Sequence, residues 1–268
     1  MKKDQFAAII VFDIDGVIRD VGNSYRRAIS DTVENFTDNA WRPTLEDIDA
    51  LKSEGIWNND WKVSQELVYR YFESQGKSRS RLNLDYDRIV EFFQKRYRGQ
   101  NPELFDGYIA TEPLLISPSY LQQLSDNKIG WGFFSGATRG SAEYILKKRL
   151  GIENPILVAM EDAPGKPDPT GLLAAVAQIS EHPSCPLFYL GDTVADMLTI
   201  QKAQEIKPEA NWIAVGILPP HVQSSTSKQA SYTEKLKTAG AAIVLNNATE
   251  LSITRIAELE KIAQLPIK

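Results

Sequence analysis

Hydrophobic residues follow three different spacings along the chain, and these spacings divide it into three segments. Residues 6–12 are an uninterrupted apolar run, which is typical of a parallel strand buried on both faces. Over residues 24–97 apolar side chains recur every three or four positions, which predicts helices and little strand. From about residue 104 short apolar runs alternate with helical spacing, which predicts repeated strand–helix units. The pattern therefore predicts an α/β fold, with a doubly wound parallel sheet of the Rossmann-like type and a smaller α-helical domain.

The middle segment contains four expected helices, each marked by apolar residues at helical spacing. Their marker residues run from Tyr25 to Phe36, from Leu45 to Leu51, from Leu67 to Phe72 and from Tyr86 to Phe93. A stretch of this length can form a small domain of its own. We therefore expect residues 19–103 to form a helical domain, and residues 1–18 with 104–268 to form the α/β core.

The last segment is expected to supply the rest of the sheet and the helices that cover it. Strands are expected at residues 129–134, 155–159, 187–190, 212–215 and 242–245. Helices are expected after Ser117-Pro118, after Ser135, and over residues 169–179, 194–205 and 251–265. In such a sheet the carboxyl ends of the strands gather on one edge, and ligands bind there.

Composition and charge narrow the range of partners. The 268 residues carry a net charge of −5, so the broad basic excess of nucleic-acid-binding proteins is missing. No apolar run approaches the ~18 residues that a membrane span needs. The single cysteine, Cys185, excludes an internal disulfide and fits a reducing compartment. We expect a cytoplasmic protein without nucleic-acid or membrane partners, and nothing in the sequence indicates its oligomeric state.

Two acids follow the first strand, at the edge where ligands are expected. Asp13 and Asp15 are separated by one residue, so both side chains lie on the same side if the extended geometry continues. Gly16 then allows a sharp turn. Two carboxylates crowded at the end of a buried strand cost free energy unless a cation or a reaction uses them. The alternative is an ordinary turn with solvated acids.

Polar residues also follow the later strands. Ser135 and Gly136 supply a hydroxyl and a backbone N–H that suit a phosphate oxygen, although a simple turn would need the same residues. Lys166 lies in a loop stiffened by two prolines, residues 165–169, and Asp168 is expected to cap the next helix.

Two further aspartates suggest a metal site at the same edge. Asp192 ends a buried strand, and Asp196 lies one helical turn beyond it. Hard divalent cations such as Mg²⁺ prefer oxygen ligands, a few of them from the protein. Asp13, the backbone carbonyl of Asp15 and Asp192 would form such a set.

Taken together, these residues resemble the four motifs of the haloacid dehalogenase superfamily of phosphotransferases, in the same order. In this chain they are Asp13-x-Asp15-Gly16, the strand ending at Ser135, Lys166-Pro167, and Gly191-Asp192 with Asp196. The resemblance spans about residues 6–196, and the helical insert resembles the cap of that family. Asp15 is present in the family's phosphatases and phosphomutases and missing in its dehalogenases, so the resemblance argues against carbon–halogen cleavage.

The resemblance implies a Mg²⁺-dependent phosphatase that acts on a small phosphorylated metabolite. Asp13 would attack phosphorus and form an aspartyl-phosphate, while Asp15 would protonate the leaving oxygen and then activate water. Mg²⁺, Ser135 and Lys166 would neutralise charge on the transferred group, and Asp196 would orient Lys166 or a metal-bound water.

Substrate specificity is expected to lie in the helical cap. The candidates there are Asn58, Asn59, Asp60 and Trp61. Helix capping and core packing are the alternatives for these residues. Arg19 and Arg139 are candidates for a second anionic group on the substrate, with solvated surface charge as the alternative.

The sequence is also compatible with two other functions. A phosphomutase of the same fold would share every motif, and only the fate of the phosphoryl group separates it from a phosphatase. A binding module that retained the fold is the third possibility. The complete set of acids, lysine and hydroxyl favours catalysis, because a binding module has no need for all of them.

Overall fold

The structure is a computed structural model that describes residues 6–57, 59–101 and 104–263. The chain forms two compact units. The core unit comprises Met1–Asp20 and Leu114–Lys268, and the helical unit comprises Val21–Pro113. Among the described residues no helix combines the length and the apolar character that crossing a membrane requires.

The second boundary between the units falls ten residues later than the predicted position after residue 103. A short 3₁₀ helix, η2 (Tyr108–Thr111), belongs to the helical unit. The Tyr108 hydroxyl donates to Asp31 at 2.6 Å, and the Arg27 guanidinium lies 4.3 Å from the centre of the Tyr108 ring. These contacts join η2 to the first helix of the unit.

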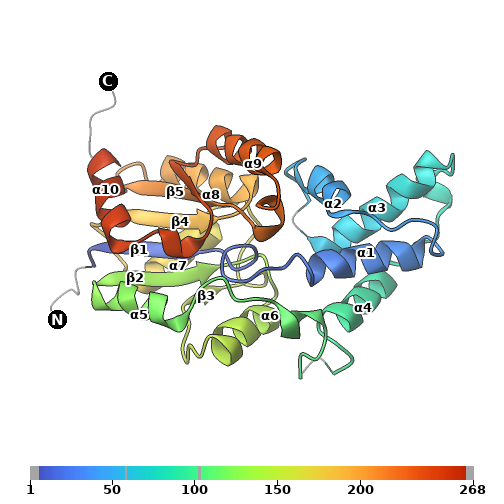
Figure 1. Cartoon of the computed structure of the whole chain (residues 1–268), viewed down its shortest axis with the longest axis horizontal. Helices are drawn as coiled ribbons and strands as arrows, with labels where there is room; N and C mark the ends of the chain where they lie inside the picture. The colour runs from blue at the N-terminus through green and yellow to red at the C-terminus, as the bar shows by residue number, and fades with distance from the viewer. Residues whose placement is uncertain (1–5, 58, 102–103, 264–268) are drawn as a thin grey trace. The chain divides into compact units, whose positions relative to one another are not determined.

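The core unit is built on a parallel sheet. Its strands are β1 (Ala8–Phe12), β2 (Ile129–Phe134), β3 (Leu157–Val158), β4 (Leu187–Gly191), β5 (Trp212–Ile217) and β6 (Ile243–Leu245). The described residues form one six-stranded sheet in the order β3-β2-β1-β4-β5-β6, with β1 between β2 and β4 (Figure 1). Every residue of β1 is buried, as the apolar run predicts.

Helices cover both faces of this sheet. They are α5 (Pro118–Asp126), α6 (Arg139–Glu143), the π-helical η3 (Tyr144–Arg149), α7 (Thr170–Ile179), α8 (Val194–Ile206), α9 (Thr226–Thr238) and α10 (Ile253–Ala263), with 3₁₀ turns η4 (Pro220–Val222) and η5 (Ala248–Glu250). On one face Leu172 of α7, Met197 of α8 and Leu236 of α9 share a buried cluster with β1 and β4. The fold class predicted from the sequence is confirmed.

The opposite face of the sheet is covered by α5 and by the segment that leads into α10. The Tyr120 ring of α5 packs edge-on against Phe12, with ring centres 6.5 Å apart. Its hydroxyl donates to the carbonyls of Ala248 and Leu251, at 3.0 and 3.1 Å. The helices on the two faces together bury the whole of β1. The polar groups follow its carboxyl end.

The helical unit contains the four helices expected from the apolar spacing. They are α1 (Tyr25–Phe36), α2 (Leu45–Lys52), α3 (Asp60–Ser74) and α4 (Tyr86–Tyr97), with a 3₁₀ turn, η1 (Arg79–Arg81). The marker residues Ile29, Val68 and Ile89 are fully buried where α1, α3 and α4 pack together. Thr44 forms a capping box with Asp47 at the start of α2.

Three details differ from the sequence prediction. The strand expected at 155–159 is reduced to the two residues of β3. The helix α9 was not predicted, because only Leu236 of its thirteen residues is buried and the apolar period is weak. Pro169, not Asp168, occupies the N-cap of α7, although the Asp168 carboxylate accepts the Thr170 N–H at 2.9 Å.

Candidate active site

The carboxyl ends of β1 and β4 carry the acidic residues. The two strands are hydrogen-bonded neighbours, and the Asp13 N–H donates to the Leu190 carbonyl at 2.8 Å. Asp13 therefore follows β1 at the point where Asp192 follows β4. Asp196 lies in the first turn of α8, in a capping box with Thr193.

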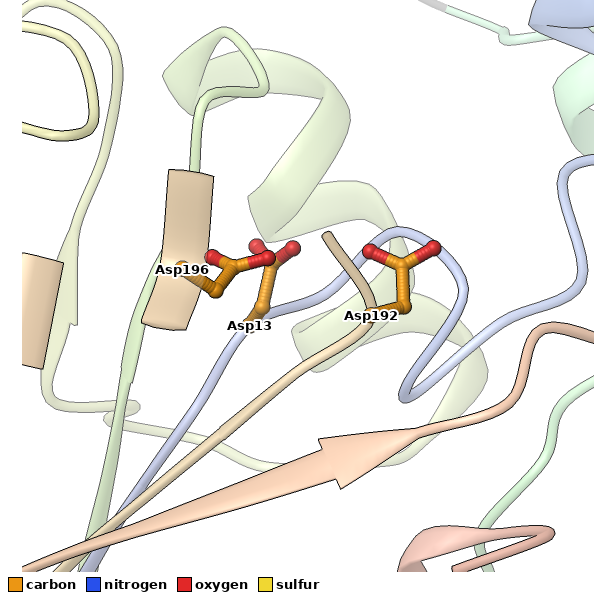
Figure 2. Close-up of side chains that lie close together, drawn as sticks. All are labelled: Asp13, Asp192 and Asp196. Carbon is orange, nitrogen blue, oxygen red and sulfur yellow. The ribbon is translucent and has the colours of Figure 1, made fainter. Parts of the chain in front are cut away.

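These elements bring three carboxylates together. One oxygen of each of Asp13, Asp192 and Asp196 lies within 4.8 Å of the other two, and all three residues are buried. Figure 2 shows the side chains next to one another, with Asp13 between the other two. Three acids at this spacing repel one another strongly unless cations neutralise them.

One lysine supplies part of that positive charge. The Lys166 ammonium lies 2.8 Å from Asp13 Oδ1 and 2.6 Å from Asp196 Oδ1, with its side chain 9% exposed. Its nitrogen also lies 5.3 Å from the centre of the Phe134 ring and 5.5 Å from that of Tyr189. Burial acts to lower the pKa of Lys166, but Asp13 and Asp196 outweigh it and raise the pKa above its usual value. Lys166 is therefore a fixed positive charge at this edge.

Asp13 and Asp196 share Lys166 but differ in their protonation. Burial raises the pKa of Asp13 to about 7; Lys166 opposes this increase, and the charges of Asp196 and Asp15 add to it. For Asp196 burial also acts to raise the pKa, but Lys166 and hydrogen bonds from Thr193 and Tyr189 outweigh it and lower the value. Asp196 thus stays ionised, while Asp13 becomes ionised near neutral pH.

The hydrogen bonds of Asp196 explain this difference. Its Oδ1 accepts from the Tyr189 hydroxyl at 2.8 Å in addition to Lys166. Its Oδ2 accepts from the Thr193 N–H at 3.0 Å and from the Thr193 hydroxyl at 2.6 Å. Because both oxygens are engaged in this way, Asp196 is better suited to hold Lys166 than to bind a metal.

The sequence analysis did not identify Tyr189 as a site residue. It is fully buried within β4, where the apolar run gives a tyrosine the appearance of core packing. A buried tyrosine hydroxyl normally needs a hydrogen-bond partner. That requirement, together with the acids after the same strand, is the signal in the sequence that could have identified it.

Asp13 and Asp192 are suited to bind a divalent cation through their oxygen atoms. Gly16 has a φ of +76°, and a Cβ there would lie 2.1 Å from Asp192 Oδ2. The backbone that follows Asp15 therefore lies directly against the Asp192 carboxylate, an approach that only glycine permits. Asp13, Asp192 and the backbone carbonyl of Asp15 are all hard oxygen donors, the type that Mg²⁺ prefers.

Ser135 and Gly136 follow β2, on the other side of β1. In the strand register Phe133 lies beside Phe12, so these residues are at the same edge of the sheet as Asp13. Ser135 is buried; its N–H donates to the Val158 carbonyl at 3.0 Å, and its hydroxyl accepts from the Ala137 N–H at 3.1 Å. Gly136 is exposed. A hydroxyl and an open backbone segment thus stand beside the acids, as a phosphate site requires.

Arg19 contacts Asp15 and is not a surface residue. Its Nε and Nη2 both lie 2.6 Å from Asp15 Oδ1, and its side chain is fully buried whereas that of Asp15 is 25% exposed. The alternative of a solvated surface charge is therefore wrong for Arg19. By contrast, the Arg139 side chain is 42% exposed and pairs with Asp162 and Glu143.

The remaining specificity candidates lie in the helical unit, apart from Asn58, which is outside the described residues. Asn59 is the N-cap of α3, and its side chain accepts the N–H groups of Trp61 and Lys62, both at 3.0 Å. Asp60 pairs with Lys52 at 2.7 Å, and Trp61 is half-buried. The structure shows the capping role of Asn59, and substrate recognition by these residues stays a prediction.

Comparison with known proteins supports the assignment that the motifs suggest. A family model described as haloacid dehalogenase-like hydrolase matches residues 7–204. An imidazoleglycerol-phosphate dehydratase of Phytophthora nicotianae is 29% identical over 242 residues, which cover 88% of this chain and 49% of that protein. The chain therefore spans about half the length of this curated relative.

Two solved structures share the fold. A phosphonoacetaldehyde hydrolase-like protein from Oleispira antarctica has a TM-score of 0.66 and 18% identity, covering 96% of this chain and 94% of that one. A β-phosphoglucomutase from Clostridium difficile has a TM-score of 0.62 and 18% identity, covering 96% and 98%. At this identity the likeness concerns the fold alone.

Proposed function

Because the chain belongs to the haloacid dehalogenase-like hydrolase family, and is thus a hydrolase, we propose that it is a Mg²⁺-dependent phosphatase of a small phosphorylated metabolite. The single observation that carries this proposal is the buried Asp13–Lys166–Asp196 arrangement, at 2.8 and 2.6 Å. This arrangement supports Asp13 as the nucleophile, because a fixed positive charge lies against it and a second acid, Asp15, follows two residues later.

The reaction has two chemical steps, and Asp13 takes part in both. In the first, a carboxylate oxygen of Asp13 forms a bond to phosphorus while the bond from phosphorus to the substrate oxygen breaks. Asp15 donates a proton to that leaving oxygen. In the second, Asp15 accepts a proton from water, and the resulting hydroxide displaces the Asp13 carboxylate and releases inorganic phosphate.

The surrounding residues stabilise charge on the transferred group. Lys166 neutralises the phosphoryl oxygens and is itself held by Asp196, while the Ser135 hydroxyl and the Gly136 N–H supply hydrogen bonds. When bound by Asp13, Asp192 and the carbonyl of Asp15, Mg²⁺ supplies further charge neutralisation. These roles are the ones that the resemblance implies, and the contacts of Lys166 support them.

The substrate is best sought among compounds whose phosphate lies on a small organic group. The curated relative is named for imidazoleglycerol phosphate, so this compound belongs in the first panel together with sugar and amino-alcohol phosphates. The likeness to a β-phosphoglucomutase keeps a phosphomutase as the second candidate. Release of inorganic phosphate supports the phosphatase, and formation of an isomer supports the mutase.

The test is a phosphate-release screen of the purified protein with Mg²⁺ and with EDTA. Asp13→Asn is the variant without the nucleophile, and Asp126→Asn, at an exposed carboxylate that ends α5, is the matched control. We expect release from one or a few compounds that needs Mg²⁺, persists in Asp126→Asn and disappears in Asp13→Asn. Turnover in Asp13→Asn near that of the wild type would contradict the proposed mechanism.

A further inference from the structure

We infer that Arg19 is a positioning residue for Asp15: it holds one oxygen of the carboxylate and leaves proton exchange to the other. This inference rests on the proposed function, in which Asp15 is the acid and base. It concerns a residue that the motif does not include, and one that the sequence suggested for a different task, contact with the substrate.

The contacts between the two side chains are specific to one oxygen. Nε and Nη2 of Arg19 both lie 2.6 Å from Oδ1 of Asp15. Nε donates a hydrogen bond to that oxygen, and Nη2 makes an ion-pair contact with it. A planar guanidinium held in this way fixes the direction of the oxygen more closely than a lysine ammonium could. With Oδ1 held in this way, Oδ2 is the oxygen that exchanges a proton with the leaving group and with water.

Arg19 is itself held firmly by its backbone. Its N–H donates to the Ile14 carbonyl at 3.2 Å, and its carbonyl accepts the Gly16 N–H at 2.9 Å. It also forms isolated β-bridges with Asp15 and with Leu114. Backbone hydrogen bonds therefore close the loop that follows β1. The Arg19 guanidinium extends from this loop to a residue four positions earlier in the chain.

The burial of Arg19 supports a role in holding Asp15. Arg19 is fully buried, and a buried guanidinium is costly unless it is paired. The acid with which it pairs is half-buried and stands two residues from the nucleophile. A proton-transfer group must lie within hydrogen-bonding reach of the reacting oxygen, and small errors in position reduce the rate greatly. Fixing Asp15 is therefore a direct contribution to the rate.

The experiment compares two phosphate esters that differ in their need for an acid. An alkyl phosphate expels an alkoxide, which must be protonated, whereas p-nitrophenyl phosphate expels a stable phenolate. We expect Arg19→Met to reduce kcat/KM for the alkyl ester on the order of ten- to a hundredfold, with a much smaller loss for p-nitrophenyl phosphate. This quantity reports the transfer to Asp13, in which Asp15 is the acid, and not the later attack of water. Arg19→Lys, which retains the charge, should recover part of the alkyl activity.

A buried arginine outside the site is the matched control. Arg26 is buried and pairs with Asp49 at 2.5 Å in the helical unit. Arg26→Met should leave the ratio of the two activities at its wild-type value, even if the protein becomes less stable. An equal loss of kcat/KM on both esters in Arg19→Met would mean that Arg19 acts only on the fold, and would overturn the inference.

A double-mutant comparison separates failure of this inference from failure of the proposed function. If Arg19 acts through Asp15, then Asp15→Asn with Arg19→Met loses no more alkyl activity than Asp15→Asn alone. Losses that multiply contradict the inference while leaving the phosphatase intact. If the wild type hydrolyses neither ester and forms no phosphoenzyme with any compound of the panel, the proposed function fails, and this inference fails with it.

Discussion

The two units of this protein differ in how their buried carboxylates are paired with cationic side chains. In the helical unit Glu66, with its side chain 8% exposed, is paired with two arginines, Arg70 at 2.9 Å and Arg79 at 2.8 Å. In the core unit three buried carboxylates lie together, and two of them pair with one lysine, Lys166. The first arrangement gives its buried acid two cationic partners, which also pair with two exposed acids, as in a structural network of ion pairs. The second arrangement buries three acids with one lysine, and a bound divalent cation would neutralise them further.

The position of each group in the fold explains this difference. The pairs of Glu66 join α3 to η1 within one small unit, so they stabilise local structure. The acids of the core unit come from two neighbouring strands and the start of a helix, and they meet because parallel strands end at a common edge. We propose that the acidic cluster of the core unit serves chemistry and that the ion pairs of the helical unit serve stability.

Removing the lysine from the core cluster should have the largest effect. Lys166→Met takes away the fixed positive charge beside Asp13, so kcat should fall on the order of 10²- to 10³-fold. Arg70→Met, at a partner of Glu66, should keep kcat within about twofold of the wild type, because surface ion pairs contribute little beyond ~1 kcal/mol of local stability. Steady-state kinetics on the identified substrate measures both. Equal losses in the two variants would remove the distinction between the units.

The pH dependence of stability should reveal the burial of the Asp13 carboxyl without any substrate. The pKa of the Asp13 carboxyl is raised from 3.8 in a free side chain to about 7 in the folded protein. Between these two values the unfolded chain has lost the proton that the folded chain keeps, so this carboxyl lowers stability as pH rises through that window. Above about pH 7 its contribution is constant and unfavourable.

Asp13→Asn removes this effect, so it should be more stable than the wild type at pH 8 in EDTA, by a few kcal/mol. The advantage should shrink as pH falls from 7 toward 4. Urea denaturation of both proteins over this range measures it. Asp126→Asn is the control, since it exchanges an exposed carboxylate. An advantage of Asp13→Asn that is independent of pH would contradict the assignment.

Binding of Mg²⁺ should stabilise the core unit by less than the Asp13→Asn substitution does at pH 8. With free Mg²⁺ at a hundredfold excess over its Kd, stability should rise by about 2.7 kcal/mol. Asp192→Asn should abolish most of this rise, because it replaces the charged carboxylate that lies against Gly16 with a neutral amide, a weaker ligand. Thermal unfolding with Mg²⁺ and with EDTA is the measurement. A full Mg²⁺ effect in Asp192→Asn would place the metal elsewhere.

The smallest effect is expected from a hydroxyl that is three contacts away from the nucleophile, through Asp196 and Lys166. Tyr189→Phe removes the hydrogen bond of 2.8 Å to Asp196, which is worth about 1 kcal/mol. The activity should fall a few-fold, with KM unchanged, because Asp196 holds Lys166 less firmly. Wild-type kcat in Tyr189→Phe would show that this bond serves only the packing of β4.

The sequence predicted most of the core fold because buried parallel strands produce apolar runs that end abruptly in polar residues. The strands β1, β2 and β4 were found in this way, and the acids after them with them. The polar helix α9 was missed, since a helix that buries one side chain leaves almost no apolar period. The length of strand β3 was overestimated, because an apolar run does not show how many of its residues pair with a neighbouring strand.

Within the site, the sequence indicated which residues meet at the edge but not how their side chains are bonded. Arg19 directly follows a turn, where no period indicates the direction of a side chain, so its contact with Asp15 could not be inferred. Asn59 was proposed both for recognition and for capping, and the structure shows the cap. Such choices depend on local backbone geometry, which residue spacing alone does not determine.

The measurement that tests the central claim most directly is detection of the phosphoryl group on Asp13. The protein would be mixed with substrate and Mg²⁺, quenched in acid, and analysed by peptide mass spectrometry. We predict a phosphoryl group on the peptide that contains Asp13, and none at that position in Asp13→Asn. Its absence from the wild type during active turnover, or its appearance on a different residue, would contradict the account.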